Sequence, residues 1–122
     1  MKFDVLVGKT ITKIENLNNV ELIFTLDTGD TYKLYHMQDC CEEVEIEDIC
    51  GELDDLIGEP LLRAEEVIYD NTNPEGVPSK EYQDESFLWT FYKLDTRKGG
   101  VTIRWYGESN GYYSEQVDFA KI

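Results

Sequence analysis

Cysteine, histidine and basic residues are all scarce in this sequence, and each scarcity argues against a class of protein. The chain has three cysteines and one histidine among 122 residues. Three cysteines do not make the disulfide framework that small secreted domains need, so we expect three reduced thiols. Eleven lysines and arginines stand against 26 aspartates and glutamates, a net charge of −15. This balance opposes direct binding to nucleic acid and favours a basic partner.

Long apolar runs are also missing. No stretch approaches the ~18 consecutive apolar residues of a transmembrane helix. The apolar run before Gly8 is too short for a signal peptide. We therefore expect a cytoplasmic protein without membrane contact. Because 41% of the chain is hydrophobic, it can bury a core without disulfides or metal, and we expect a single domain over residues 1–122.

The sequence does contain the two-residue alternation of β-strands. Residues 10–36 predict two or three strands, with Leu22, Phe24 and Leu26 alternating with more polar residues. A hairpin turn is predicted at residues 27–30.

The C-terminal half is also strongly β. Residues 87–92 are apolar on both faces, which is typical of a central strand, and residues 101–105 supply its partner. Asn110-Gly111 predicts a hairpin, after which residues 112–119 close the same sheet. Residues 70–86 hold several turn signals and are interpreted as a long loop that is either mobile or functional.

One short helix is predicted near residues 52–57. Ile49, Leu53, Leu56 and Ile57 follow helical spacing, and Gly58 would end the helix. The predicted fold class is therefore α+β, mainly antiparallel β. We expect a meander-like sheet or a partly open barrel carrying this helix.

The negative charge is concentrated in residues 38–70. This stretch has thirteen acids against Arg63 alone, a net charge of −12, and its acids alternate with core residues. Twelve charges correspond to about 20 Å of DNA duplex, so such a surface could occupy a basic nucleic-acid groove on another protein. The alternative is a solvated acidic face. The predicted partner-binding residues are Glu43, Glu45, Glu47, Asp48, Glu52, Asp54 and Asp55.

Aromatic and basic residues in the C-terminal half suggest a second kind of site. Together they could stack on a nucleotide and pair with its phosphates. The alternative is an ordinary β-sheet core with tyrosines at its margin. The candidate ligand-binding residues are Trp89, Arg97, Arg104, Trp105 and Tyr112.

His36, Cys40, Cys41 and Cys50 are the candidate metal ligands. Zinc takes four such groups in a tetrahedron, but this spacing is not that of a standard zinc site, and neighbouring residues on an extended chain point apart. The alternative is a histidine that ends a strand with a satisfied hydrogen bond, with the cysteines as small core residues. No cofactor is expected. No nucleophile, base and anion stabiliser can be assembled, so we do not expect an enzyme.

The segment His36–Glu42, HMQDCCE, and the segment 46–58, IEDICGELDDLIG, carry a family resemblance. The chain resembles a family of small uncharacterised proteins encoded by bacteriophages and prophages, and the similarity continues through residues 60–66, Trp89 and residues 104–113. The resemblance implies a phage protein inside a bacterial cell and a signature at His36–Glu42. It implies no activity and no catalytic residue.

These observations favour a non-enzymatic acidic binding protein. In a phage setting it would inhibit a host nucleic-acid-binding or defence protein by charge mimicry. The expected partner is a basic host protein, without direct binding to nucleic acid or membrane, and a homo-oligomer is left open. The alternative is a small-ligand or nucleotide-binding protein that uses the aromatic sheet and the loop 70–86.

Overall fold

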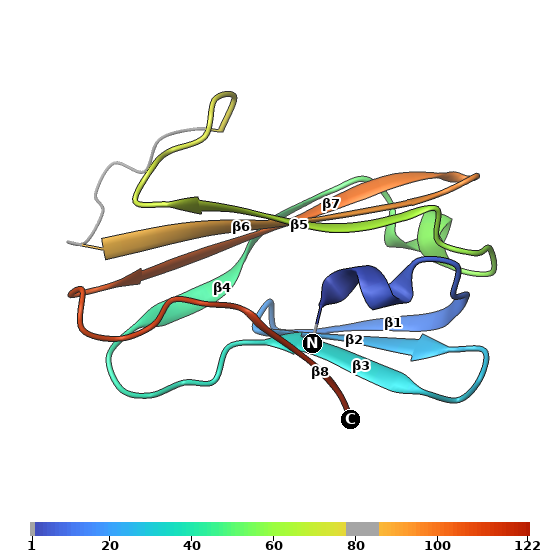
Figure 1. The fold of residues 1–122 in the computed structure, drawn as a ribbon, viewed down its shortest axis with the longest axis horizontal. Helices are drawn as coiled ribbons and strands as arrows, with labels where there is room; N and C mark the ends of the chain where they lie inside the picture. The colour runs from blue at the N-terminus through green and yellow to red at the C-terminus, as the bar shows by residue number, and fades with distance from the viewer. Residues whose placement is uncertain (1, 78–85) are drawn as a thin grey trace.

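The computed structural model describes residues 2–77 and 86–122, and this part of the chain forms two antiparallel four-stranded sheets (Figure 1). The strand order is β1-β2-β3-β8 in the first sheet and β4-β7-β6-β5 in the second. The first sheet consists of β1 (Ile11–Leu17), β2 (Glu21–Leu26), β3 (Thr31–Tyr35) and β8 (Asp118–Lys121). The second consists of β4 (Glu43–Cys50), β5 (Arg63–Asp70), β6 (Ser86–Thr96) and β7 (Gly99–Ser109).

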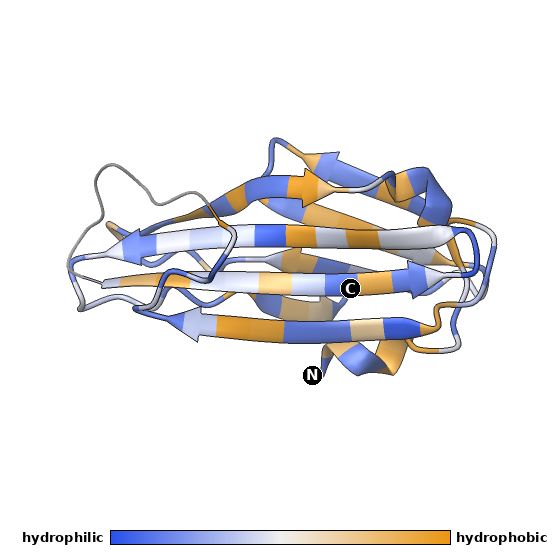
Figure 2. Ribbon diagram, turned by 90° about the horizontal axis from the view of Figure 1, so that it is seen from above, coloured by the Kyte–Doolittle hydropathy of each residue, from blue (hydrophilic) through white to orange (hydrophobic). Residues whose placement is uncertain are grey.

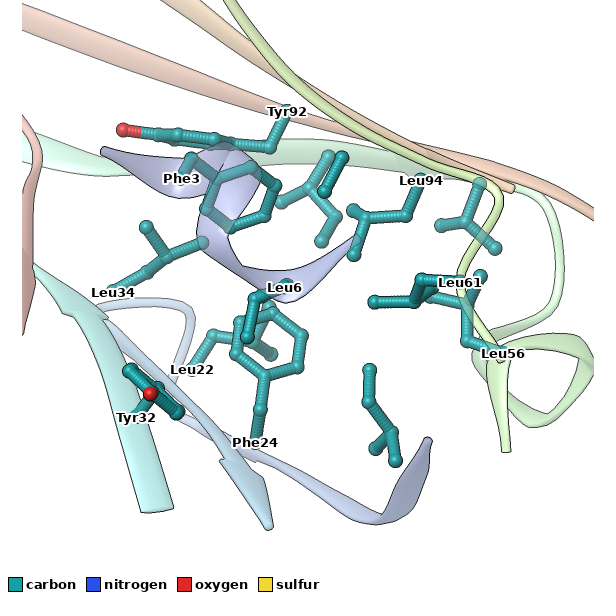
Figure 3. Packing of buried hydrophobic residues seen from close by; sticks show 14 of the residues in the cluster. Phe3, Leu6, Leu22, Phe24, Tyr32, Leu34, Leu56, Leu61, Tyr92 and Leu94 are labelled. Atoms are coloured by element: carbon teal, nitrogen blue, oxygen red, sulfur yellow. The ribbon is translucent and has the colours of Figure 1, made fainter. Parts of the chain in front are cut away.

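The two sheets lie as two layers over one hydrophobic core (Figure 1). Inward residues of both sheets meet there, as the two-residue period of strands requires. The short 3-10 helix η1 (Phe3–Leu6) inserts Phe3 between the layers. Its ring centroid lies 4.7 Å from that of Tyr92 and 6.3 Å from that of Phe24, one residue from each sheet (Figure 3).

The expected strands in both halves of the chain are confirmed. Leu22, Phe24 and Leu26 are buried on β2, and the turn at residues 27–30 joins β2 to β3. β6 is a central strand, since it pairs with β5 on one side and β7 on the other.

The expected single meander or partly open barrel is wrong. The chain changes layer twice, once between β3 and β4 and once between β7 and β8. A turn does follow Ser109, but the chain then crosses to the first sheet, where Phe119 pairs with Leu34. A turn motif sets only a local reversal, whereas the partner of the next strand is decided by long-range packing.

The short helix predicted near residues 52–57 is reduced to one 3-10 turn, η2 (Leu53–Leu56). Ile49 belongs to β4 rather than to a helix. Two glycines with positive φ, Gly51 (+107°) and Gly58 (+89°), bound the segment in which a helix could form and keep it short. A Cβ at Gly51 would lie 2.5 Å from the Gly100 carbonyl oxygen, so this sharp bend requires glycine. Among the described residues no helix is long and apolar enough to span a membrane.

The expected long loop is described only in its first part. β5 extends to Asp70 and β6 begins at Ser86, and residues 78–85 of the loop lie outside the described residues. Asn71 accepts a hydrogen bond from the Phe87 backbone N–H, and Asn73 accepts one from the Trp89 indole. Residues 71–73 are therefore fixed onto the start of β6.

Candidate interaction surface

The outward face of β4 presents a row of carboxylates. β4 is an edge strand that pairs only with β7, and its Val44 and Ile46 are buried while Glu43 and Glu45 are exposed. The alternation of hydrophilic and hydrophobic residues along this edge strand is visible in Figure 2. Side chains two residues apart on a strand are about 6.7 Å apart, so Glu43 and Glu45 form a regularly spaced acidic row.

A β-bulge extends this row by one residue. The register with β7 shifts between Ile46 and Asp48, so Asp48 stands opposite Arg104. A bulge adds a residue to one strand and thereby changes the alternation after it. Arg104 bonds the Glu47 carboxylate and lies 3.7 Å from that of Asp48. Two successive acids thus face outward, with one arginine between them.

The remaining acids of the predicted patch follow at the end of β4. Glu52 and Asp54 are exposed and Asp55 is half-buried, and the two aspartates belong to η2. Lys98 donates a hydrogen bond to the Asp54 carbonyl oxygen, which fixes this turn against the β6–β7 hairpin. We define the β4 acidic surface as Glu43, Glu45, Glu47, Asp48, Glu52, Asp54 and Asp55.

Other carboxylates of the same acidic stretch lie elsewhere. Glu59 and Glu65 form ion pairs with arginines. Glu66 and Asp70 line cavities beside β5, the opposite edge of the sheet. Glu42 is buried, with 3% of its surface exposed. The charge that is continuous in sequence is therefore divided among several surfaces, and β4 carries the exposed row.

Glu42 precedes β4, and its side chain is buried on the same inward-facing spacing as those of Val44 and Ile46. Its carboxylate accepts four hydrogen bonds, two at each oxygen. We define the Glu42 network as this carboxylate and its donors: His36 Nε2 (2.8 Å), Gln38 Nε2 (3.1 Å) and the backbone N–H groups of Asp39 (3.0 Å) and Cys40 (2.9 Å). A buried carboxylate needs such donors, because it has left water.

Both ring nitrogens of His36 lie within hydrogen-bond distance of an oxygen. Nδ1 lies 2.6 Å from the Gln116 carbonyl oxygen, which can only accept. Nε2 lies 2.8 Å from Glu42, whose carboxylate is already surrounded by donors and therefore accepts here as well. The ring therefore connects the Glu42 carboxylate to the backbone of the segment before β8.

The Glu42 network joins both places where the chain changes layer. His36 and Glu42 belong to the connection from β3 to β4, and Gln116 belongs to the connection from β7 to β8. Asp118 adds a bond by accepting the Met37 backbone N–H at 3.0 Å. The segment His36–Glu42 thus positions the start of β4, and with it the acidic row.

Acid is expected to weaken the fold through Glu42. Burial raises the pKa of this carboxyl group, but hydrogen bonds from His36 and backbone N–H groups lower it further, from 4.5 to about 2. A lowered pKa stabilises the fold above the unfolded value, and this contribution is lost as pH falls from about 4.5 towards 2. Urea midpoints measured across this range should fall more steeply for the wild type than for Glu42→Gln; parallel curves would contradict the assignment.

The structure does not gather the four candidate metal ligands. Cys40 and Cys41 form a disulfide with each other, and Cys50 is a free, exposed cysteine at the far end of β4. The expectation of three reduced thiols is therefore wrong, as is that of core cysteines. The chain bends at residues 40–41, which brings together two sulfurs that an extended chain would separate. Among the described residues no cluster could hold a metal ion.

The candidate nucleotide-binding residues lie in four different places. Trp105 is fully buried in the core, while Trp89 lies on the outer face of the same sheet, with Arg104 at 5.6 Å from its ring. Arg97 is in the β6–β7 turn, and Tyr112 is 83% exposed in the turn after β7. Only Trp89 and Arg104 come together, and that arginine also bonds carboxylates of β4.

Comparison with sequence families matches residues 4–119 to a domain of unknown function, DUF7448. The chain belongs to the DUF7448 family. The expectation of an uncharacterised family is confirmed. No curated protein and no solved structure matches the chain.

In this DUF7448 chain, sequence reasoning missed the role of Glu42. It grouped His36 with the cysteines as metal-type ligands and gave Glu42 no role of its own. A signal was nevertheless present in the two-residue spacing of inward-facing side chains. Glu42 continues the spacing of Val44 and Ile46, and His36 continues that of Leu34. A carboxylate and an imidazole that continue the inward-facing positions of two consecutive strands into their connection favour a buried pair.

Proposed function

We propose that the protein is a non-enzymatic acidic binding protein that presents the β4 acidic surface to a basic partner. We further propose a phage-encoded protein in the cytoplasm of a bacterial host. There it would inhibit a nucleic-acid-binding or defence protein by taking the place of DNA in a basic groove.

The observation that carries this proposal is the row of exposed carboxylates on an edge strand. β4 has eight residues, which span about 26 Å at the usual rise per residue. The seven carboxylates of this surface match the phosphate charge of about 12 Å of duplex, a length that the strand is long enough to cover. Among the described residues only two bases, Arg104 and Lys98, contact this surface, so most of its carboxylates are available to a partner.

Rigidity of the row is a second support. An array of charges binds more tightly when it is held in place before binding. The Glu42 network fixes the start of β4, the ladder with β7 fixes its length, and the Ile46 N–H donates to the Asn19 carbonyl oxygen at 2.7 Å. The carboxylates are thus positioned on a folded strand rather than on a mobile tail.

The proposal is tested by affinity capture from a bacterial lysate. Immobilised protein should retain a basic nucleic-acid-binding or defence protein at low salt and release it as salt rises, because the contact is between charges. The captured protein, once purified, should bind the wild type directly. Failure to retain any basic protein, or retention independent of salt, would contradict the proposal.

A further inference from the structure

A groove lies at the edge of the second sheet opposite β4. It consists of two adjoining cavities, of about 230 and 380 Å³, between β5, β6 and the segment 114–119 that crosses to β8. The two cavities share Ile68, Leu88 and Gln116. Ile68 is 47% exposed although it faces the inner side of the sheet, because the first sheet does not cover this end of β5. The groove is therefore a cleft in which the apolar Ile68 and Leu88 lie among polar side chains.

Carboxylates line both halves of the groove. Glu66 and Asp118 line the first cavity, and Asp70 and Glu115 line the second. Within the described part of the chain, none of the four forms an ion pair with a lysine, arginine or histidine. Unlike Glu47 or Glu65, these carboxylates have no cation from the described residues beside them, although they line a partly apolar cleft.

Glu66 and Asp118 each accept a hydrogen bond at one carboxylate oxygen. Tyr92 donates its hydroxyl to Glu66 Oε2 at 2.7 Å, and the Met37 N–H donates to Asp118 Oδ2 at 3.0 Å. Burial raises the pKa of Tyr92, as do its bond to Glu66 and the charges of Glu66 and Asp118. Glu66 bonds this hydroxyl directly and Asp118 lines the same cavity, and neither Glu66 Oε1 nor Asp118 Oδ1 accepts a hydrogen bond from a described residue.

Thr90 provides an independent sign of a ligand. It is only 2% exposed, stands opposite Ile68 in the β5–β6 ladder and lines the first cavity. Its hydroxyl forms no hydrogen bond with any described residue, whereas Ser86 donates to Glu115 and Tyr92 donates to Glu66. A nearly buried hydroxyl without a protein partner is a group that a bound molecule would satisfy.

We propose that the groove binds a linear aliphatic polyamine. One ammonium group donates hydrogen bonds to Glu66, Asp118 and the Thr90 hydroxyl. The methylene chain packs on Ile68 and Leu88, and a second ammonium group lies beside Asp70 in the other cavity. Two apolar side chains shared by both cavities, with carboxylates in each cavity, match the alternation of methylenes and charges in such a molecule. This site is separate from the β4 acidic surface and does not depend on its function.

Isothermal titration with spermidine, and with Mg²⁺ at equal ionic strength, tests this proposal. Wild type should bind one spermidine more tightly than Mg²⁺, which lacks methylenes. The variant E66Q/D118N keeps both hydrogen-bond acceptors and should bind spermidine roughly tenfold or more weakly, since bonds to charged groups are the strong ones. T90V, which keeps the side-chain shape, should weaken binding roughly two- to fivefold.

The matched control is E43Q/E45Q, which removes two charges from β4. Screening should limit its effect on spermidine binding to about twofold or less. The proposal is overturned if this control weakens binding as much as E66Q/D118N, or if Mg²⁺ binds as tightly as spermidine. A lysine-rich peptide that binds the groove where spermidine does not would also overturn it. Thermal unfolding of each variant confirms that it is folded.

Discussion

Replacing Trp105 with alanine is expected to lower the free energy of unfolding by about 3–5 kcal/mol, the range for large aromatic side chains removed from a core. Trp105 is fully buried on β7 and belongs to the cluster that joins the two sheets. Its truncation would leave a cavity that the surrounding strands cannot fill. Denaturant unfolding at neutral pH measures the loss.

The matched control for this prediction is Tyr112→Ala. Tyr112 is 83% exposed, so its removal should change stability by no more than about 0.5 kcal/mol. Both residues were candidates for ligand contact in the sequence, and the structure separates them by burial alone. If Trp105→Ala proved as mild as the control, the assignment of Trp105 to the core would be wrong.

Neutralising Glu43, Glu45 and Glu47 together is expected to weaken binding to the basic partner by roughly 100-fold, at about 1 kcal/mol for each charge pair lost. The three glutamines keep the size of the side chains, and all three positions lie on the outward face of β4. The fold should therefore survive, which circular dichroism can confirm. The affinity is measured by titration of the purified partner.

A control variant with the same change in net charge distinguishes contact at the β4 acidic surface from attraction of the partner by the net charge of the whole protein. Asp4, Asp27 and Glu75 are exposed and form no ion pair with other described residues. Their joint neutralisation should change the affinity by about threefold or less, because charges outside the contact are screened over about 8–10 Å. Equal losses in the two triple variants would mean that only net charge matters.

The sequence predicted the strands well because alternation is a local property. Leu22, Phe24 and Leu26 revealed β2 without any knowledge of the sheet it joins. The two changes of layer were missed, since Asn110-Gly111 signals a turn but not which strand Phe119 will pair with. That choice depends on burial of Phe119 against Tyr32 and Phe3, which come from distant parts of the chain.

The acidic stretch shows the same division between local and long-range information. Its composition was visible in the sequence, and so was the outward phase of Glu43 and Glu45. The bulge before Asp48 was not visible, because it exists only relative to the register of β7. The separation of Glu66 and Asp70 from the other acids was not visible in the sequence either, because it results from the placement of β5 at the opposite edge of the sheet.

Competition with DNA tests the central claim most directly. The captured partner is first bound to a labelled DNA duplex, and the protein is then added at several salt concentrations while the free duplex is measured. If the β4 acidic surface occupies the groove for DNA, the duplex is released, and E43Q/E45Q/E47Q releases far less at the same concentration. A complex that holds duplex and protein at once, or equal release by both proteins, would contradict charge mimicry by β4.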